Sequence, residues 1–244
     1  MGESYRYLKF RKVNEHLIES LVNRTIFFSS PNKLNDPFDC RIVLDGAFKR
    51  ATRSTTGRHL QLYEKLLKHR NKLKILQDTL QDVGICSFSI DIDSIISNHI
   101  LWSHYAEKHR GVCLIYSFDD DFIRDENNGI IGRSQVTYGD DKLTNWLIGF
   151  KDKTRCFPEE FTKIYWTVKS HVWEYEKEVR LVRNATGVLT IPSGSIEQIC
   201  FGLDTPPEQI ALIQKLAADY AGCRSFARMV PEDSDFGMRL EKME

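Results

Sequence analysis

Carboxylate and guanidinium side chains are concentrated in one short segment, Trp173–Arg180, which reads WEYEKEVR. The aliphatic residues that follow favour a strand, whose alternation would place all three glutamates and the arginine on one face. Three carboxylates side by side repel one another, so one interpretation is an ion-pair network with Arg180 as the cation. The other is that Glu176 or Glu178 lies beside a developing positive charge, as in reactions that pass through an oxocarbenium ion. Spacing alone favours the ion-pair network, because structural networks also gather carboxylates.

A second polar segment, Ser30–Asp39, reads SPNKLNDPFD and is rich in residues that form turns. We expect a structured loop in which Asn35, Asp36 and Asp39 hold the backbone or face a substrate. Together with His104, the two aspartates could instead bind a metal ion, as in a metal-dependent nuclease. The glutamate chemistry requires no metal, and no metal is expected on that hypothesis.

The elements that must position these groups begin with Ile100–Phe118. Its apolar spacing predicts a helix that leads at Gly111 into a buried strand, Val112–Tyr116. Upstream, Val83–Ile90 predicts another strand. This strand, helix and strand would place Trp102 and Tyr105 near the centre of the molecule. His104 and His109 could act as a base or as metal ligands, but they are five residues apart and do not share a helix face, which favours histidines at the edge of the core.

Hydrophobic periodicity predicts the remaining elements of the chain. No repeat or linker divides the sequence, so we expect a single α+β domain over residues 1–244, with a mixed or mostly antiparallel sheet and helices inserted between strands. The expected elements are a strand at Tyr5–Phe10, a helix at Glu15–Val22 capped by Asn14, a strand at Thr25–Ser29, a helical insertion over about 48–82, a strand at Arg133–Tyr138, a helical stretch at Asp140–Glu160, a strand and hairpin-like turn from Leu181 to Ile191, a strand at Ile196–Leu203, and a helix at Glu208–Tyr220 that ends at Gly222.

Composition limits the class of protein. Lysine plus arginine equals aspartate plus glutamate at 34 each, which argues against a nonspecific DNA-binding protein. The absence of an apolar run near 18 residues and of a signal-peptide core predicts a cytoplasmic protein with no membrane contact. The six cysteines show no zinc-site spacing and are expected to be structural thiols. A basic cluster in the helical insertion could contact phosphate, although a solvated helix face is the commoner use of such residues; it comprises Lys65, Lys68, His69, Arg70, Lys72 and Lys74.

Four segments in order resemble the DUF2971 family of bacterial and phage proteins: TIFFSSPNKLNDPFDC, GICSFS, LWSHYAEKHRGVCLIY and KSHVWEYEKEVRLV. The family is expected to carry an NDPFD or NDPFE loop, a WxHYAxxHxGxC segment and a WxYExExR strand. The resemblance extends from Tyr5 to about Gly202. Many such proteins look like components of abortive-infection or toxin systems. This implies an effector in phage defence that acts on a macromolecular acceptor (protein or nucleic acid) or is held by an antitoxin.

The order of polar residues also resembles the ADP-ribosyltransferase superfamily, in which a basic residue lies on the first strand, a hydroxyl residue on a middle strand and an ExE pair on a later one. That resemblance implies an NAD-consuming enzyme in which Arg6 binds the NAD phosphates and Ser87 or Ser89 positions the nicotinamide ribose. Here the middle strand reads CSFS rather than a plain Ser-Thr-Ser. Glu176 and Glu178 would be catalytic. The other implied NAD-binding residues are Tyr7, Trp102 and Tyr105.

A noncatalytic alternative is a nucleotide-binding or partner-binding module with an aromatic pocket formed by Trp102, Tyr105, Trp166 and Trp173. Polar residues set among apolar strands are most simply explained by a shared pocket. The sequence therefore predicts one concave site that brings together Arg6, the loop Asn35–Asp39, Trp102, Tyr105, Glu176 and Arg180.

Overall fold

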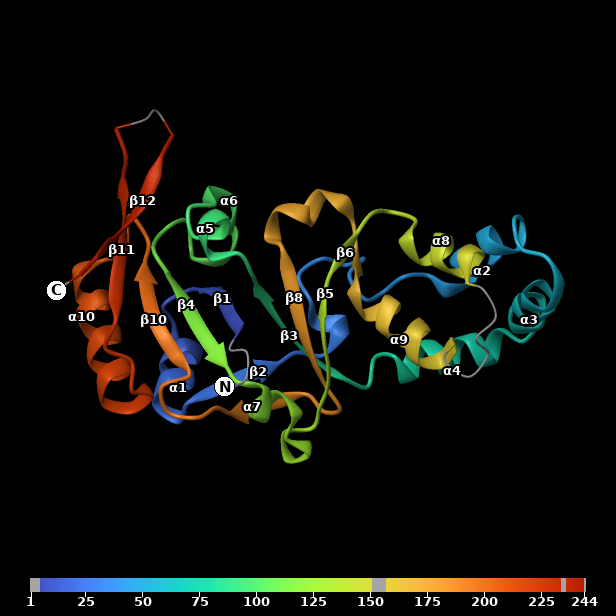
Figure 1. The fold of residues 1–244 in the computed structure, drawn as a ribbon, viewed down its shortest axis with the longest axis horizontal. Coiled ribbons are helices and arrows are strands. Elements are labelled where there is room, and N and C mark those ends of the chain that lie inside the picture. The colour runs from blue at the N-terminus through green and yellow to red at the C-terminus, as the bar shows by residue number, and fades with distance from the viewer. Residues whose placement is uncertain (1–4, 151–156, 234–235, 244) are drawn as a thin grey trace.

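An eight-stranded sheet forms the centre of the molecule (Figure 1). The computed structural model describes residues 5–150, 157–233 and 236–243. The strands of the sheet are β1 (Tyr5–Arg11), β3 (Gly84–Ser89), β4 (Val112–Phe118), β5 (Ile130–Gln135), β8 (Glu178–Arg183), β10 (Ile196–Phe201), β11 (Phe226–Pro231) and β12 (Met238–Lys242). They lie in the order β12-β11-β10-β4-β1-β3-β8-β5, and the pairs are antiparallel except for β10 with β11. The predicted α+β class with a mostly antiparallel sheet is confirmed.

The sheet is held together weakly between β1 and β3. β1 pairs with β4 along all seven of its residues, whereas Leu8 with Ser89 is the one residue pair that joins β1 to β3 in the described part of the chain. The two strands therefore separate on one side of Leu8. A two-stranded sheet of β2 (Thr25–Phe28) and β9 (Gly187–Thr190) lies beside the gap, and Ser29 bridges to Ile85 of β3.

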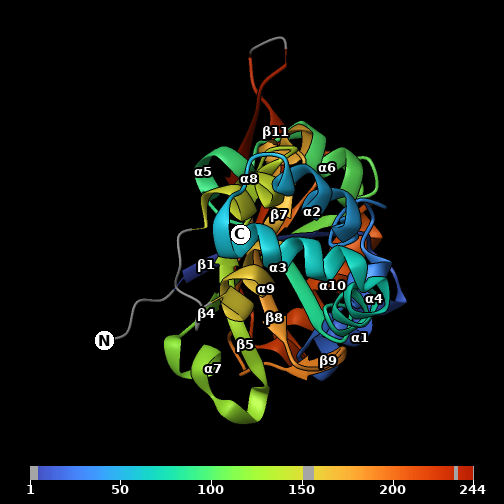
Figure 2. The same ribbon diagram turned by 90° about the vertical axis from the view of Figure 1, so that its right-hand side faces the viewer.

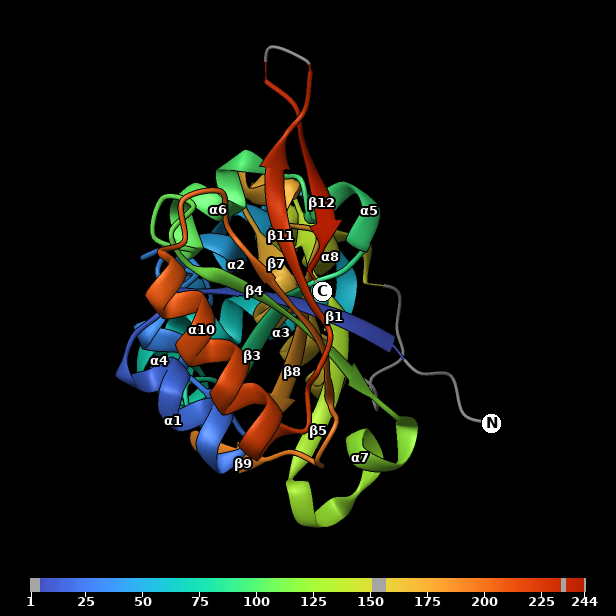
Figure 3. The same cartoon turned by 90° about the vertical axis from the view of Figure 1, so that its left-hand side faces the viewer.

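Helices cover both faces of β1, which explains why residues on both faces of this strand, Tyr7 on one and Leu8 and Phe10 on the other, are buried. Tyr7 packs in the core beneath α1 (Glu15–Asn23) and α10 (Pro207–Leu216), which lie side by side in Figure 3. Leu8 and Phe10 pack on the opposite face beneath α5 (Ile92–Ile95) and α6 (His99–Tyr105). The site described below therefore lies beside a strand that helices cover on both faces.

A group of helices forms a separate core at one end of the molecule (Figure 2). Apolar side chains on their facing surfaces include Phe48, Tyr63 and Tyr165, all fully buried. The helices are α2 (Leu44–Thr52), α3 (Gly57–Lys68), α4 (Arg70–Thr79), α8 (Lys142–Gly149) and α9 (Phe157–Thr167). No helix in the described ranges is long and apolar enough to cross a membrane.

Short elements complete the described chain. They are α7 (Asp120–Arg124), β6 (Thr137–Tyr138), β7 (Val168–Lys169), the 3-10 helices η1 (Pro31–Lys33), η2 (Glu126–Asn128) and η3 (His171–Glu176), and the π-helical turn η4 (Ala217–Ala221).

Most predicted elements are confirmed. The predicted helix and strand of Ile100–Phe118 correspond to α6 and β4, and Asn14 caps α1 by accepting a hydrogen bond from the backbone N–H of Leu17. A tight turn joins α6 to β4, and a Cβ on Gly111 would lie 2.2 Å from the carbonyl oxygen of Arg11. Only glycine fits this close approach of two backbones.

Three predictions about elements are wrong or incomplete, and two strands were not predicted. The segment Trp173–Arg180 is not one strand, because Lys177 adopts a left-handed conformation (φ 43°) that separates η3 from β8. The hairpin predicted within Leu181–Ile191 is absent, since β8 and β9 pair in different sheets. The sequence reading did not find β11 and β12. The predicted stretch Asp140–Glu160 contains α8 and the start of α9, and residues 151–156 lie outside the described part. The single-domain organisation stays a prediction.

Candidate functional site

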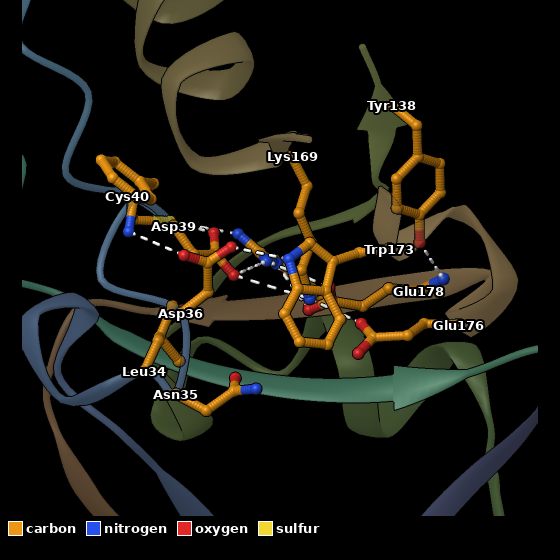
Figure 4. A network of polar contacts seen from close by, with 12 residues as sticks. Leu34, Asn35, Asp36, Asp39, Cys40, Tyr138, Lys169, Trp173, Glu176 and Glu178 are labelled. Carbon is orange, nitrogen blue, oxygen red and sulfur yellow. Dashed lines mark hydrogen bonds and ion pairs between the residues drawn. The ribbon is translucent and has the colours of Figure 1, made fainter. Parts of the chain in front are cut away.

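A buried network of ionised side chains lies where β8 begins, and Figure 4 shows Asp39, Lys169, Glu176 and Glu178 within it. Arg180 is its central cation. The Arg180 side chain is 0 % exposed. Its Nε donates to Oε1 of Glu178 at 2.6 Å, its Nη2 donates to Oδ2 of Asp39 at 2.6 Å, and its Nη1 donates to the backbone oxygen of Trp166 at 2.7 Å. The guanidinium thus joins the 35–39 loop, β8 and the end of α9.

Lys169 is the second cation of the network and was not found by sequence reasoning. It lies on β7, directly after α9. Its Nζ donates to Oε2 of Glu176 at 2.5 Å and to Oε2 of Glu178 at 2.9 Å, and lies 5.1 Å from the centre of the Trp173 ring. Burial lowers the pKa of Lys169, but the neighbouring carboxylates outweigh burial and raise it above its ordinary value. Lys169 therefore carries a positive charge at neutral pH.

The two glutamates differ in what holds them. Glu178 accepts hydrogen bonds from Arg180, Lys169 and the Ser87 side chain. Its backbone N–H donates to the hydroxyl of Tyr138 at 2.7 Å (Figure 4). Burial raises the pKa of Glu178, yet the charges of Arg180 and Lys169 prevail and lower it to about 2. Both oxygens of Glu178 are therefore committed to the network.

Glu176 occupies the edge of the network rather than its centre. Its Oε1 accepts a hydrogen bond from the hydroxyl of Tyr105 at 2.6 Å, and its Oε2 is bound by Lys169. Burial raises the pKa of Glu176, and the charge of Lys169 opposes that rise. Burial and the adjacent Glu176 also raise the pKa of Tyr105, so its hydroxyl stays a donor. Asn35 completes this chain by donating from Nδ2 to the Tyr105 oxygen at 3.0 Å.

A small pocket of about 140 Å³ lies over Glu176 at the point where β1 and β3 separate. Besides Asn35, Tyr105 and both glutamates, β3 contributes Ser87 and Ser89, and β1 contributes Lys9. The Nζ of Lys9 donates to the backbone oxygen of Ser87 at 2.7 Å.

A larger cleft of about 610 Å³ continues from this pocket and shares Lys9, Asn35 and Ser87 with it. One wall carries Phe27 and Val188, which are direct partners across β2 and β9 and are 53 % and 62 % exposed. Lys9 and Arg11 line the cleft from β1, and neither has a carboxylate partner recorded within the described residues. The cleft thus combines two cations from β1 with an apolar wall, and Glu19 of α1 also lines it.

Most of the predicted site residues converge. The pocket brings together Asn35, Asp39, Ser87, Ser89, Tyr105, Glu176 and Glu178, with Arg180 directly behind it. Asp36 is not among the residues that line this pocket. It accepts hydrogen bonds from the indole N–H of Trp173 at 2.7 Å and from the backbone N–H of Phe38 at 2.8 Å.

Four predicted site residues lie elsewhere. Arg6 is exposed and pairs with Glu197 at 2.8 Å, because β1 reaches the site only from Leu8 onward. The others belong to the core or the surface: Tyr7 packs against Phe88 and Phe118, Trp102 donates its indole N–H to the backbone oxygen of Ile96, and His104 is exposed with its ring edge-on to Trp173.

The two alternative site hypotheses gain no geometric support. Within the described ranges, no group of three or more histidine, cysteine or acidic residues could hold a metal ion, so the cluster of Asp36, Asp39 and His104 does not form. The predicted aromatic pocket does not form either, since Trp102 is in the core and Trp166 donates its indole N–H to the backbone oxygen of Leu80.

Replacing Arg180 should destabilise the fold far more than neutralising Glu176. Arg180→Ala would leave Asp39 and Glu178 buried with Lys169 as their one recorded cation in the described residues, and breaking such a buried pair costs about 3–5 kcal/mol. Glu176→Gln preserves the shape of a side chain at the network edge, so we expect a loss of about 1 kcal/mol. Urea unfolding measures the loss of stability in both variants. The matched control is Glu174→Gln, whose side chain lies on the exposed side of η3. Equal losses for the Arg180 and Glu176 variants would contradict this description.

The stability that Glu178 contributes should depend on pH. Its folded-state pKa is depressed from an ordinary value of 4.5 to about 2. The contribution is therefore complete above about pH 4.5 and is lost as the pH falls towards about 2. We expect the gap in melting temperature between the wild type and Glu178→Gln to be widest near neutral pH and to shrink through this window. A gap that does not change with pH would show that Glu178 is not held as an ionised group.

Comparison with known proteins gives one match. Residues 101–181 match the model of the family described as "Protein of unknown function (DUF2971)". The matched residues include Tyr105, Lys169, both site glutamates and Arg180, whereas the 35–39 loop and β3 precede them. No curated protein and no solved structure matches the chain. The match confirms the resemblance to the DUF2971 family over residues 101–181, which include the LWSHYAEKHRGVC and WEYEKEVR motifs.

Proposed function

We propose that the chain binds NAD in the cleft between β1 and β3 and transfers the ADP-ribosyl group to an acceptor. One observation carries this proposal: the carboxylate of Glu176 is buried at the pocket where β1 and β3 separate, and serine hydroxyls of β3 line the same pocket. A buried carboxylate that faces a ligand space is a typical means of stabilising a positively charged transition state.

The larger cleft has the chemistry that a dinucleotide requires. NAD carries two phosphates, which Lys9 and Arg11 can neutralise without giving up an existing ion pair in the described residues. The apolar surface of Phe27 and Val188 can pack against a planar base. The sequence resemblance assigns binding of the NAD phosphates to Arg6. We instead propose Lys9 and Arg11, which lie further along the same strand, for this role.

The proposed reaction breaks the bond between the ribose and the nicotinamide nitrogen. The electron pair of that bond leaves with nicotinamide and neutralises its pyridinium charge, so positive charge develops on the ribose. Glu176 would stabilise this charge, while Lys169 and Tyr105 hold its carboxylate in place. The acceptor oxygen or nitrogen then bonds to the ribose carbon and gives its proton to Glu176 or to water. Glu178 has no direct step and acts by supporting Lys169 and Arg180.

A second opening supports a macromolecular acceptor. A cavity of about 590 Å³ shares Asn35, Asp39 and Lys169 with the Glu176 pocket. Its lining includes Phe38, which is 79 % exposed, and the exposed Val43 and Val172. Apolar side chains from separate segments that gather at one opening are typical of protein contact surfaces. We also propose a role in phage defence, control by an antitoxin and a cytoplasmic location.

NAD turnover should depend on Glu176 and not on its neighbour Glu174. We expect purified wild-type protein to bind NAD and release nicotinamide, with water or a lysate component as acceptor. Glu176→Gln should bind NAD with similar affinity but release nicotinamide at least roughly a hundredfold more slowly, the scale of losing an electrostatic stabiliser. Calorimetry measures binding and chromatography measures nicotinamide. Glu174→Gln, on the same short helix but exposed, should behave as wild type.

Other outcomes of the same assays would reject the proposal. If calorimetry detects no binding at millimolar NAD, the proposal that the cleft binds the dinucleotide is wrong. Cleavage of nucleic acid that a chelator abolishes, with NAD left intact, would favour the nuclease hypothesis. Binding of NAD without any nicotinamide release in the presence of lysate would indicate a binding module.

A further inference from the structure

The helical insertion carries a strong positive charge in a chain that is neutral overall. Residues 48–82 contain nine lysines and arginines against three aspartates and glutamates, while the whole chain has equal numbers of each sign. The proposed NAD cleft uses none of these residues. Segregation of charge to one part of a neutral molecule creates a local field that attracts an anionic partner.

The cations of α3 gather on one side of the helix, opposite its core side. Arg58, Lys65 and Lys68 recur at intervals of seven and three residues, which places them on one face, and all three are exposed. Tyr63 lies on the other side, fully buried, with its ring centre 5.2 Å from that of Phe48. We call Arg58, Lys65 and Lys68 the α3 basic face.

Few of these charges are neutralised within the protein. The ion pairs recorded for the described part of the insertion are Lys49 with Asp45 and Arg50 with Asp141, and both involve α2. No carboxylate partner is recorded for the α3 basic face within the described residues. Its like charges repel one another, and a bound polyanion would relieve that repulsion.

The position of α3 suits a long ligand. The helix lies at the end of the molecule away from β1 and β3 (Figure 1), and Figure 2 looks towards this end. The face spans ten residue steps, or about 15 Å at the helical rise. A nucleic-acid duplex carries a charge about every 3.4 Å along each strand, so a face of this length can meet several phosphates.

We propose that the α3 basic face binds the sugar-phosphate backbone of nucleic acid without regard to sequence. A lipid surface is the less suitable polyanion, because a helix that lies on a membrane turns apolar side chains towards it. The apolar residues of α3 pack inward in the helical core, and Leu62, at 39 % exposure, is the large hydrophobic side chain of α3 that is exposed. The proposal goes beyond the reaction in the cleft and does not depend on it.

The test measures binding of a fluorescein-labelled DNA duplex and a labelled RNA strand of about 20 nucleotides by fluorescence anisotropy across a salt series. We expect the wild-type affinity to fall by roughly ten- to a hundredfold between about 50 and about 200 mM salt. The double variant Lys65→Ala with Lys68→Ala should lower the magnitude of the log-log salt slope by about 1.8. The matched control is Lys12→Ala with Lys215→Ala, which removes two exposed charges outside the insertion.

Each alternative result has a definite meaning. Equal weakening by the control pair would show a response to net charge and overturn the assignment to α3. Failure of the wild type to bind either oligonucleotide at low salt would also overturn the proposal. Binding to vesicles that contain phosphatidylserine, without binding to the oligonucleotides, would assign the face to a membrane instead. Thermal melts of both double variants should match the wild type, because the changed residues are exposed.

Discussion

The buried guanidinium of Arg180 is the interaction on which the site depends. A charge removed from water must be matched by hydrogen-bonded anions, and Arg180 obtains them from two segments far apart in the sequence, at Asp39 and Glu178. Its third donor fixes the backbone of Trp166 at the end of α9. The 35–39 loop, β8 and the helical layer are thereby held in one arrangement. This arrangement places Lys169, which follows α9, beside the two glutamates.

The same network gives the two glutamates different properties. Glu178 lies between two cations, and its pKa is low because their charges outweigh its burial. Glu176 has one cation and one phenol as partners, and burial raises its pKa. In our proposal the central carboxylate stabilises the structure and the peripheral one faces the substrate. Acceptors that bind through the opening around Phe38 would approach Glu176 past Asn35, Asp39 and Lys169, which that opening shares with the Glu176 pocket.

The sequence predicted the site better than it predicted the path of the chain. Motif spacing identified Asn35, Tyr105 and the glutamates, because polar residues among apolar ones indicate a shared pocket. It assigned phosphate binding to Arg6 and did not consider Lys9, because the part of β1 that reaches the site depends on where β1 meets β3, which only the tertiary structure defines. Lys169 carries no local signal, as a lysine after a helix is usually exposed. The left-handed turn at Lys177 was also missed, because nothing in the residue type requires it.

A crystal structure of the chain with NAD bound tests the central claim most directly. The account predicts that the ribose carbon bonded to nicotinamide lies within contact distance of the Glu176 carboxylate, with the phosphates beside Lys9 and Arg11. Glu178 should keep its contacts with Arg180 and Lys169 in the complex. A dinucleotide bound elsewhere on the molecule, or a Glu178 side chain that leaves Arg180 to face the ribose, would contradict the account.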